Sequence, residues 1–229
     1  MNFYNTRISF GNKRRFACGV LIDTYNYETS TCPMCYNERR EPDLNNLFSN
    51  KNWNPNIYMN NDYYADFLAS SIIGNGIVSE KAMIVLKENF GNTIDFGNIE
   101  MISYRDLDEA FLRKVRDYSG NKAAKQIAND PPQYYRLILN VGASLNLQLT
   151  NMELSLDCLK CGRKEYGAVA GSREDWWNNT PHIIESSWKG YDLFHVEGKG
   201  NTVFCTERFI EVYKHHALTG LEFEQVLTV

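Results

Sequence analysis

Two Cys-x-x-Cys pairs, 126 residues apart, are the feature that most constrains this chain of 229 residues. The first pair is Cys32 and Cys35, and the second pair is Cys158 and Cys161. The sequence that follows each pair repeats the same pattern at nearly the same distance. We interpret this self-similarity as a tandem duplication, and we expect the four thiols to act together.

The downstream match has three parts: an Asp with two apolar residues, a hydroxyl-Glu-base triplet, and an apolar-acidic-Phe stretch. These parts are 66–68 and 192–194, 79–81 and 206–208, and 94–96 and 221–223. Each copy predicts the order strand, turn, strand, helix, strand with antiparallel pairing, which is an α+β fold. We expect a first copy over 1–102, a helical connector over 103–133 and a second copy over 134–229. The two copies would form one compact unit, joined at a four-cysteine site.

Local signals set the ends of the two predicted helices. Ser79 and Thr206 stand where a side-chain hydroxyl can accept a free N–H of the first helical turn. Gly91 is placed to end the first helix in the left-handed conformation. Residues 37–55 are rich in Asn, Glu and Pro and predict a surface loop.

Four cysteines in two such pairs are the usual ligand set of a structural zinc site. The pairs normally lie much closer in sequence, so it is the duplication that gives a reason to bring the two turns together. Two alternatives stay open: thiols packed as small apolar residues without metal, and a redox pair. The remaining cysteines, Cys18 and Cys205, lie in apolar sequence and predict buried side chains.

Composition narrows the class of protein. The net charge is −4, which argues against a general nucleic-acid binder. No apolar run is long enough for a transmembrane helix, and Met1–Asn5 does not resemble a secretory signal. We therefore expect a cytoplasmic protein without membrane contact. In that reducing compartment, paired cysteines favour metal over disulfide.

No recognised catalytic pattern occurs in the sequence, so we do not expect an enzyme. The four histidines have no partner at metal or triad spacing, and there is no phosphate-binding loop or nucleophile elbow. The most distinctive other segment is Glu174-Asp175-Trp176-Trp177. Its tryptophans are either core residues or, beside two carboxylates, an exposed surface that binds a partner. We name these four residues as candidate partner-binding residues.

The chain resembles the bacterial double-CXXCG motif family, known from myxobacterial paralogues as immunity proteins for polymorphic toxins. The resemblance is carried by the two cysteine pairs, by Gly162 directly after the second pair, by 188–194, and by the tail segments 206–208 and 218–223. It covers most of the chain but leaves 103–132 unsupported. The chain departs from the motif at Tyr36, where the first pair should be followed by Gly.

The resemblance implies a cytoplasmic protein that binds and neutralises one cognate toxin by direct contact, with a structural zinc ion on Cys32, Cys35, Cys158 and Cys161. The residues alone do not separate this function from its main alternative, a zinc-ribbon nucleic-acid-binding protein or a general interaction module. A basic stripe beside the cysteines would favour the alternative. The candidates for such a stripe are Arg39, Arg40, Lys160, Arg163 and Lys164.

Overall fold

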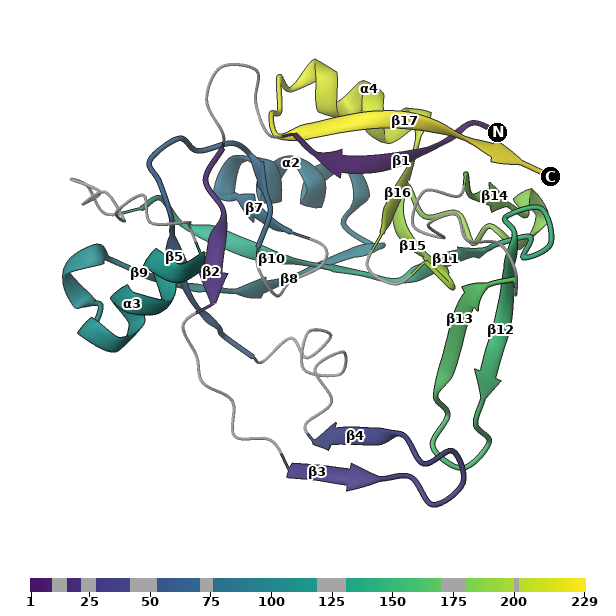
Figure 1. Cartoon of the computed structure of the whole chain (residues 1–229). Coiled ribbons are helices and arrows are strands. Elements are labelled where there is room, and N and C mark those ends of the chain that lie inside the picture. The colour runs from purple at the N-terminus through teal and green to yellow at the C-terminus, as the bar shows by residue number, and fades with distance from the viewer. Residues whose placement is uncertain are drawn as a thin grey trace.

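The chain folds as a mixed α+β protein that consists mostly of strands with few helices (Figure 1). The computed structural model describes residues 1–9, 16–21, 28–41, 53–70, 76–118, 131–169, 180–199 and 202–229. Within these ranges, no helix has the length and apolar character needed to cross a membrane. The mixture of strands and helices confirms the expected α+β class.

The strands are β1 (Phe3–Ile8), β2 (Gly19–Leu21), β3 (Glu28–Thr31), β4 (Glu38–Glu41), β5 (Asn56–Met59), β6 (Phe67–Leu68), β7 (Ile77–Ser79), β8 (Ile94–Asn98), β9 (Glu100–Ile102), β10 (Tyr134–Leu139), β11 (Val141–Ser144), β12 (Met152–Asp157), β13 (Lys164–Ala168), β14 (His182–Ile183), β15 (Leu193–Glu197), β16 (Val203–Thr206) and β17 (Leu221–Thr228). The α-helices are α2 (Glu80–Phe90), α3 (Glu109–Tyr118) and α4 (Glu207–His215). Two short 3₁₀ turns, η1 (Tyr104–Asp106) and η3 (Glu185–Ser187), complete the described elements.

Two sheets form the body of the molecule. One has the strand order β6-β7-β10-β8, and the other has the order β11-β15-β16-β1-β17-β14. In each sheet a strand leads directly into a helix, β7 into α2 and β16 into α4, and a further strand of the same sheet follows that helix. The order strand, helix, strand thus occurs once in each sheet.

The two sheets also pair their strands in the same register. Phe67 of β6 lies opposite Val78 of β7, and Leu193 of β15 lies opposite Cys205 of β16. The second pair follows the first by 126 positions on one strand (67 to 193) and by 127 on the other (78 to 205). The extra position falls in the connection between the two paired strands.

Two parallel pairs follow the same offsets, one in a separate three-stranded sheet of order β2-β5-β9 and one at the edge of the six-stranded sheet. Ile57 of β5 lies opposite Met101 of β9, and Ile183 of β14 lies opposite Thr228 of β17. The separations are again 126 positions (57 to 183) and 127 positions (101 to 228). Register is set by which face of a strand is buried, so equal registers place equivalent side chains on equivalent faces.

The two sheets exchange one strand. β1, from the start of the chain, pairs with β16 and β17 near its end, whereas β10 pairs with β7 and β8. The register is shared here as well: Tyr135 of β10 lies opposite Asn98, and Tyr4 of β1 lies opposite Gln225, which is 127 positions after Asn98. Neither sheet is therefore complete without a strand from the other half of the chain.

A shared hydrophobic cluster joins the two halves. It contains the buried faces of both α2 and α4, together with residues from β6, β15 and β16. Phe90 at the end of α2 packs against Phe209 in α4, with ring centroids 5.8 Å apart. Each of two further clusters lies around one half and takes in a residue of the exchanged strand: Tyr134 of β10 packs near Ile57, and Phe3 of β1 packs near Phe194.

The two helices also contact each other's ends through basic side chains. Lys81 in the first turn of α2 donates to the carbonyl of Ala217, just after α4 (3.1 Å). Arg208 in the first turn of α4 donates to the carbonyl of Asn89 in the last turn of α2 (3.0 Å). Carbonyls at a helix C-terminus lack intrahelical partners, so each base satisfies one of them.

Both predicted helix caps are confirmed. The Ser79 hydroxyl accepts from the backbone N–H of Ala82, and the Thr206 hydroxyl accepts from that of Phe209. Each hydroxyl also donates to a carboxylate one strand earlier, Ser79 to Asp66 and Thr206 to Asp192. In each hydroxyl-Glu-base triplet, the hydroxyl thus caps the helix, and the base contacts the end of the other helix.

Two local expectations were wrong. Gly91 is right-handed (φ −56°), because the chain continues through a further turn in which the backbone N–H of Thr93 bonds to the carbonyl of Phe90. The predicted loop at 37–55 contains β4, which pairs antiparallel with β3. Its sequence, Glu-Arg-Arg-Glu, has no apolar alternation, so the strand gives no hydrophobic signal.

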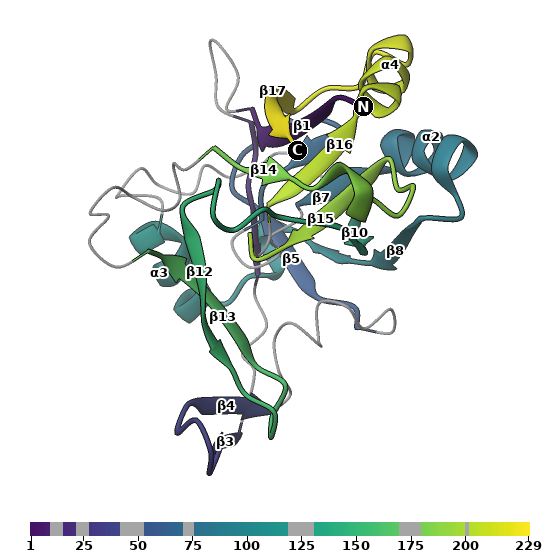
Figure 2. The ribbon, with the colours of Figure 1, turned by 90° about the vertical axis from the view of Figure 1, so that its right-hand side faces the viewer.

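Two hairpins extend from the body and meet at their tips. β3 and β4 form one, and β12 and β13 form the other (Figures 1 and 2). Glu197 of β15 holds the second hairpin to the body, since it accepts from both Lys164 and Tyr166 of β13 at 2.9 Å. The tips carry the four paired cysteines.

Candidate metal centre

Each cysteine pair lies in the turn of one hairpin, and the two turns have the same backbone hydrogen bonds. In the first turn, the N–H of Tyr36 donates to the carbonyl of Cys32 (2.9 Å). In the second, the N–H of Gly162 donates to the carbonyl of Cys158 (2.7 Å). A second bond closes each turn, from the N–H of the first cysteine to the carbonyl five residues later (3.0 and 2.9 Å). The four thiols are therefore presented by two matched turns.

Both turns need a left-handed residue directly after their second cysteine. Gly162 has φ 70°, and Tyr36 has φ 56°. Glycine takes this conformation at no steric cost, whereas a residue with a Cβ does so at a cost of about 1–2 kcal/mol. Gly162 thus meets the backbone requirement of its turn without strain, whereas Tyr36 is accommodated with strain.

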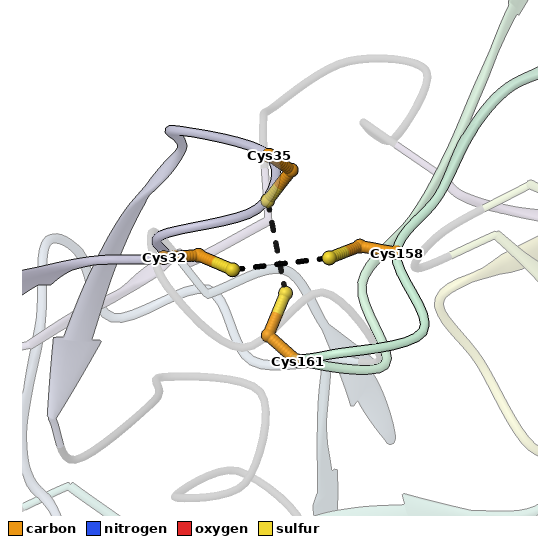
Figure 3. A group of neighbouring side chains, drawn as sticks. All are labelled: Cys32, Cys35, Cys158 and Cys161. Atoms are coloured by element: carbon orange, nitrogen blue, oxygen red, sulfur yellow. Dashed lines mark hydrogen bonds between the residues drawn. The ribbon is translucent and has the colours of Figure 1, made fainter.

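The four sulfurs converge on one point (Figure 3). All four Sγ atoms lie within 4.8 Å of one another. The equivalent cysteines face each other, with Cys32 Sγ and Cys158 Sγ 3.8 Å apart and Cys35 Sγ and Cys161 Sγ also 3.8 Å apart. A tetrahedral zinc ion with Zn–S bonds of about 2.3 Å requires sulfurs about 3.8 Å apart. The donor set therefore fits a tetrahedral ion.

The surroundings of the thiols lower the pKa of Cys32 and Cys158 and raise the pKa of Cys35. Backbone N–H groups of Cys35 and Met34 donate to Cys32 and lower its pKa to about 6. The pKa of Cys158 is lowered as well, first by the backbone N–H of Cys161. The N–H of Asn37 acts to lower the pKa of Cys35, but burial and the neighbouring thiols together raise it to about 11. The first turn thus contains one thiol with a lowered pKa and one with a raised pKa.

Four protein ligands leave no free position on a tetrahedral ion. Catalytic zinc sites keep one position for water or substrate, and structural sites do not. Backbone N–H groups aimed at the sulfurs stabilise thiolates, as a metal requires. An ion held by all four thiols would therefore have the coordination of a closed, structural site.

One further contact joins the hairpins beside the sulfurs. The Asn37 amide donates to Glu165 of β13 (3.2 Å), and Glu165 also pairs with Arg163 (2.6 Å). These groups are half-exposed, so their contribution to stability is small. These contacts therefore add little to the convergence of the four cysteines between the two tips.

The other predicted site residues cannot be placed. Glu174, Asp175, Trp176 and Trp177 lie outside the described residues. The nearby Trp188 is half-buried, packs against the ring of Phe3 and donates to the carbonyl of Tyr191. The choice between core and surface for the paired tryptophans thus stays a prediction.

Sequence reasoning missed the apolar side chains of the two turns. Met34, Tyr36 and Leu159 are 57%, 79% and 90% exposed. A large apolar residue inside a cysteine turn was an available signal, and the missing glycine at Tyr36 was a second one.

The comparisons with known proteins give no match: no family model fits the chain, and no curated protein matches its sequence.

Proposed function

We propose that Cys32, Cys35, Cys158 and Cys161 hold one structural zinc ion. The observation that carries this proposal is the convergence of four sulfurs from two distant turns within 4.8 Å. Soft thiolates in a tetrahedron favour zinc over harder or larger cations. The ion would cross-link positions 126 residues apart and so restrict the unfolded chain strongly.

We further propose that the chain arose by tandem duplication and that the ion joins the two copies. The equal strand registers support this, as do the matched helix caps and the facing of equivalent cysteines. A metal between two equivalent turns would lie on the approximate twofold axis that relates the copies. The long sequence separation of the pairs is then explained by the length of one copy.

For the whole chain we propose an immunity protein of the double-CXXCG type. It would bind and neutralise a cognate bacterial toxin in the cytoplasm through protein–protein contact, without turnover. The support is the resemblance in the cysteine pairs, in Gly162 and in the tail motifs. The four-ligand centre fits this role, because it offers no position at which a substrate could bind.

The alternative of a nucleic-acid-binding zinc ribbon has less support. Such a protein needs a basic surface beside the cysteines. Of the candidate residues, Arg163 pairs with Glu165 and Lys164 pairs with Glu197. Only Lys160 is left as a described, unpaired base of that stripe, and the side chains of Arg39 and Arg40 are not described. We therefore do not propose a nucleic-acid partner.

Elemental analysis of the purified chain tests the metal proposal. We expect about one zinc per chain, lost in Cys158→Ser and kept in Cys18→Ser, because Cys18 lies outside the cluster. A chain purified in zinc-supplemented buffer that holds no zinc, or that keeps it in Cys158→Ser, would contradict the proposal.

Co-expression with the product of the neighbouring gene tests the immunity proposal. We expect that product to be toxic alone, harmless with this chain, and recovered with it as a complex. A harmless neighbour, or a toxic one that neither binds this chain nor is neutralised by it, would refute this function while leaving the metal proposal intact.

A further inference from the structure

The tips of the two hairpins carry three large apolar side chains that are exposed. Met34, Tyr36 and Leu159 are at least half exposed, and none belongs to the three hydrophobic clusters. All three lie in the cysteine turns, at the end of the molecule farthest from the body (Figures 1 and 2). We call these residues, with Lys160, the knuckle tip.

Tyr36 is the most informative member of the knuckle tip. Its left-handed backbone (φ 56°) is strained for a residue with a Cβ, and the equivalent position in the other turn is Gly162. The side chain is 79% exposed, so it recovers little of that strain through packing. A glycine would serve the fold better, which indicates that the ring serves another purpose.

Leu159 supports the same conclusion from the second turn. It is 90% exposed, the highest value among the large apolar residues that the structure describes. Single exposed apolar residues are common on protein surfaces, but contiguous ones mark interaction sites. Two turns that converge within 4.8 Å at their sulfurs bring these side chains onto one tip.

The charge on the tip indicates the complement. Lys160 is exposed, and no carboxylate in the described part of the chain forms an ion pair with it. The chain as a whole carries a net charge of −4, so the tip differs in sign from the average surface. A partner would match the tip with an apolar recess bordered by carboxylates.

We propose that the knuckle tip is the docking surface for the partner protein, with Tyr36 and Leu159 as its anchors. This inference rests on the proposed immunity function for the identity of the partner, which would present an acidic-rimmed apolar recess. Aromatic anchors dominate the binding energy of protein interfaces. Two turns held by one ion and by the Asn37–Glu165 contact would be ordered before binding, which lowers the entropic cost of docking.

Titration of purified wild-type chain and variants with the neighbouring gene's product tests the proposal. We expect Tyr36→Gly to weaken binding by at least tenfold while thermal stability stays equal or rises, because the left-handed strain is relieved. Leu159→Ala should weaken binding by a similar factor. Ile84→Ala is the matched control, an apolar residue of α2 that is 46% exposed and far from the tip, and it should bind as wild type. Unchanged affinity in both tip variants would overturn the proposal.

A photo-crosslinking residue at position 159, with one at position 84 as control, separates this proposal from the immunity function. If the neighbouring gene's product does not bind the wild-type chain, the immunity proposal fails. The crosslinking result alone then tests whether the knuckle tip is a docking surface. Support requires one protein crosslinked only from position 159, which in purified form binds wild type and loses at least tenfold affinity for Tyr36→Gly. No crosslink, equal crosslinks from both positions, or crosslinks only between copies of this chain would overturn the docking surface.

Discussion

The two cysteine turns have the same backbone hydrogen bonds, yet they differ in the residue that follows the second cysteine. Gly162 meets the left-handed requirement of the second turn, whereas Tyr36 meets the same requirement in the first turn with a strained backbone and an exposed ring. Such a pair is an internal control, because the fold asks the same of both positions. Where one turn satisfies the fold and the other does not, the difference points to a role outside folding.

The same comparison extends to the two halves of the body. Their sheets share registers, but each is completed by a strand from the other half, β1 in one and β10 in the other. A half of the chain therefore holds a strand that it cannot use alone. Changes that separate the halves should therefore have the largest effects on stability, and substitutions of single residues the smallest.

The first prediction divides the chain into fragments 1–118 and 131–229. Each fragment lacks a strand that its own sheet needs, so we expect each alone to lose the entire stability of the fold, on the order of 5–15 kcal/mol. Together they should reassemble, since each supplies the other's missing strand. Circular dichroism and size-exclusion chromatography of the fragments, alone and mixed, check this. A fragment that folds alone would show that the exchanged strand is dispensable.

The second prediction concerns loss of the metal through Cys158→Ser. The two hairpins lie largely outside the hydrophobic clusters, so we expect them to open while the body stays folded. Amide exchange should rise by about a hundredfold or more in β3, β4, β12 and β13, and remain slow in α2 and α4. Equal acceleration throughout the chain would show that the centre supports the body instead.

The sequence predicts this centre better than it predicts the sheets. The constant offset between cysteine pairs gives a reason to join them, and hydroxyl caps at Ser79 and Thr206 are local signals that the structure confirms. Strand partners are non-local: nothing in the sequence of Phe3–Ile8 indicates that it pairs with strands about 200 residues away and not with its own half. The polar strand Glu38–Glu41 is stabilised by its turn and partner, so it shows no hydrophobic alternation.

The third prediction concerns the pH at which the metal is released. Zinc competes with protons, so acidification weakens binding and alkalinisation strengthens it. The pKa of Cys35 is raised to about 11, so its proton competes with zinc throughout the neutral range, whereas the pKa of Cys32 is lowered to about 6, so its proton competes only in acid. Below about pH 6 one more proton therefore competes than above it, and each further pH unit costs about 1.4 kcal/mol more than it does above pH 6. A chromogenic chelator should report release that steepens below pH 6. A release curve of constant slope would mean that the pKa of Cys32 is not lowered.

The fourth prediction compares the two helix caps. Thr206 is 3% exposed and its hydroxyl joins a nearly buried carboxylate, Asp192, whereas Ser79 is partly exposed. Removal of a buried hydrogen-bond partner costs more than removal of an exposed one. We expect Thr206→Ala to lower the free energy of unfolding by about 2 kcal/mol and Ser79→Ala by about 1 kcal/mol, measured by urea denaturation. The reverse order would mean that the buried network relaxes around Thr206.

The fifth prediction concerns single substitutions at the two left-handed positions. Gly162→Ala adds a Cβ that would meet no atom within 4 Å, so only the backbone conformation opposes it, and we expect a loss of about 1 kcal/mol. Tyr36→Gly removes the same strain but adds freedom to the unfolded chain, which offsets part of the gain. The expected gain is thus below about 1 kcal/mol. Thermal denaturation of the zinc-loaded variants measures both. If Tyr36→Gly destabilised the chain as much as Gly162→Ala, the ring of Tyr36 would contribute to the fold, and the argument that it is kept for binding would lose its basis.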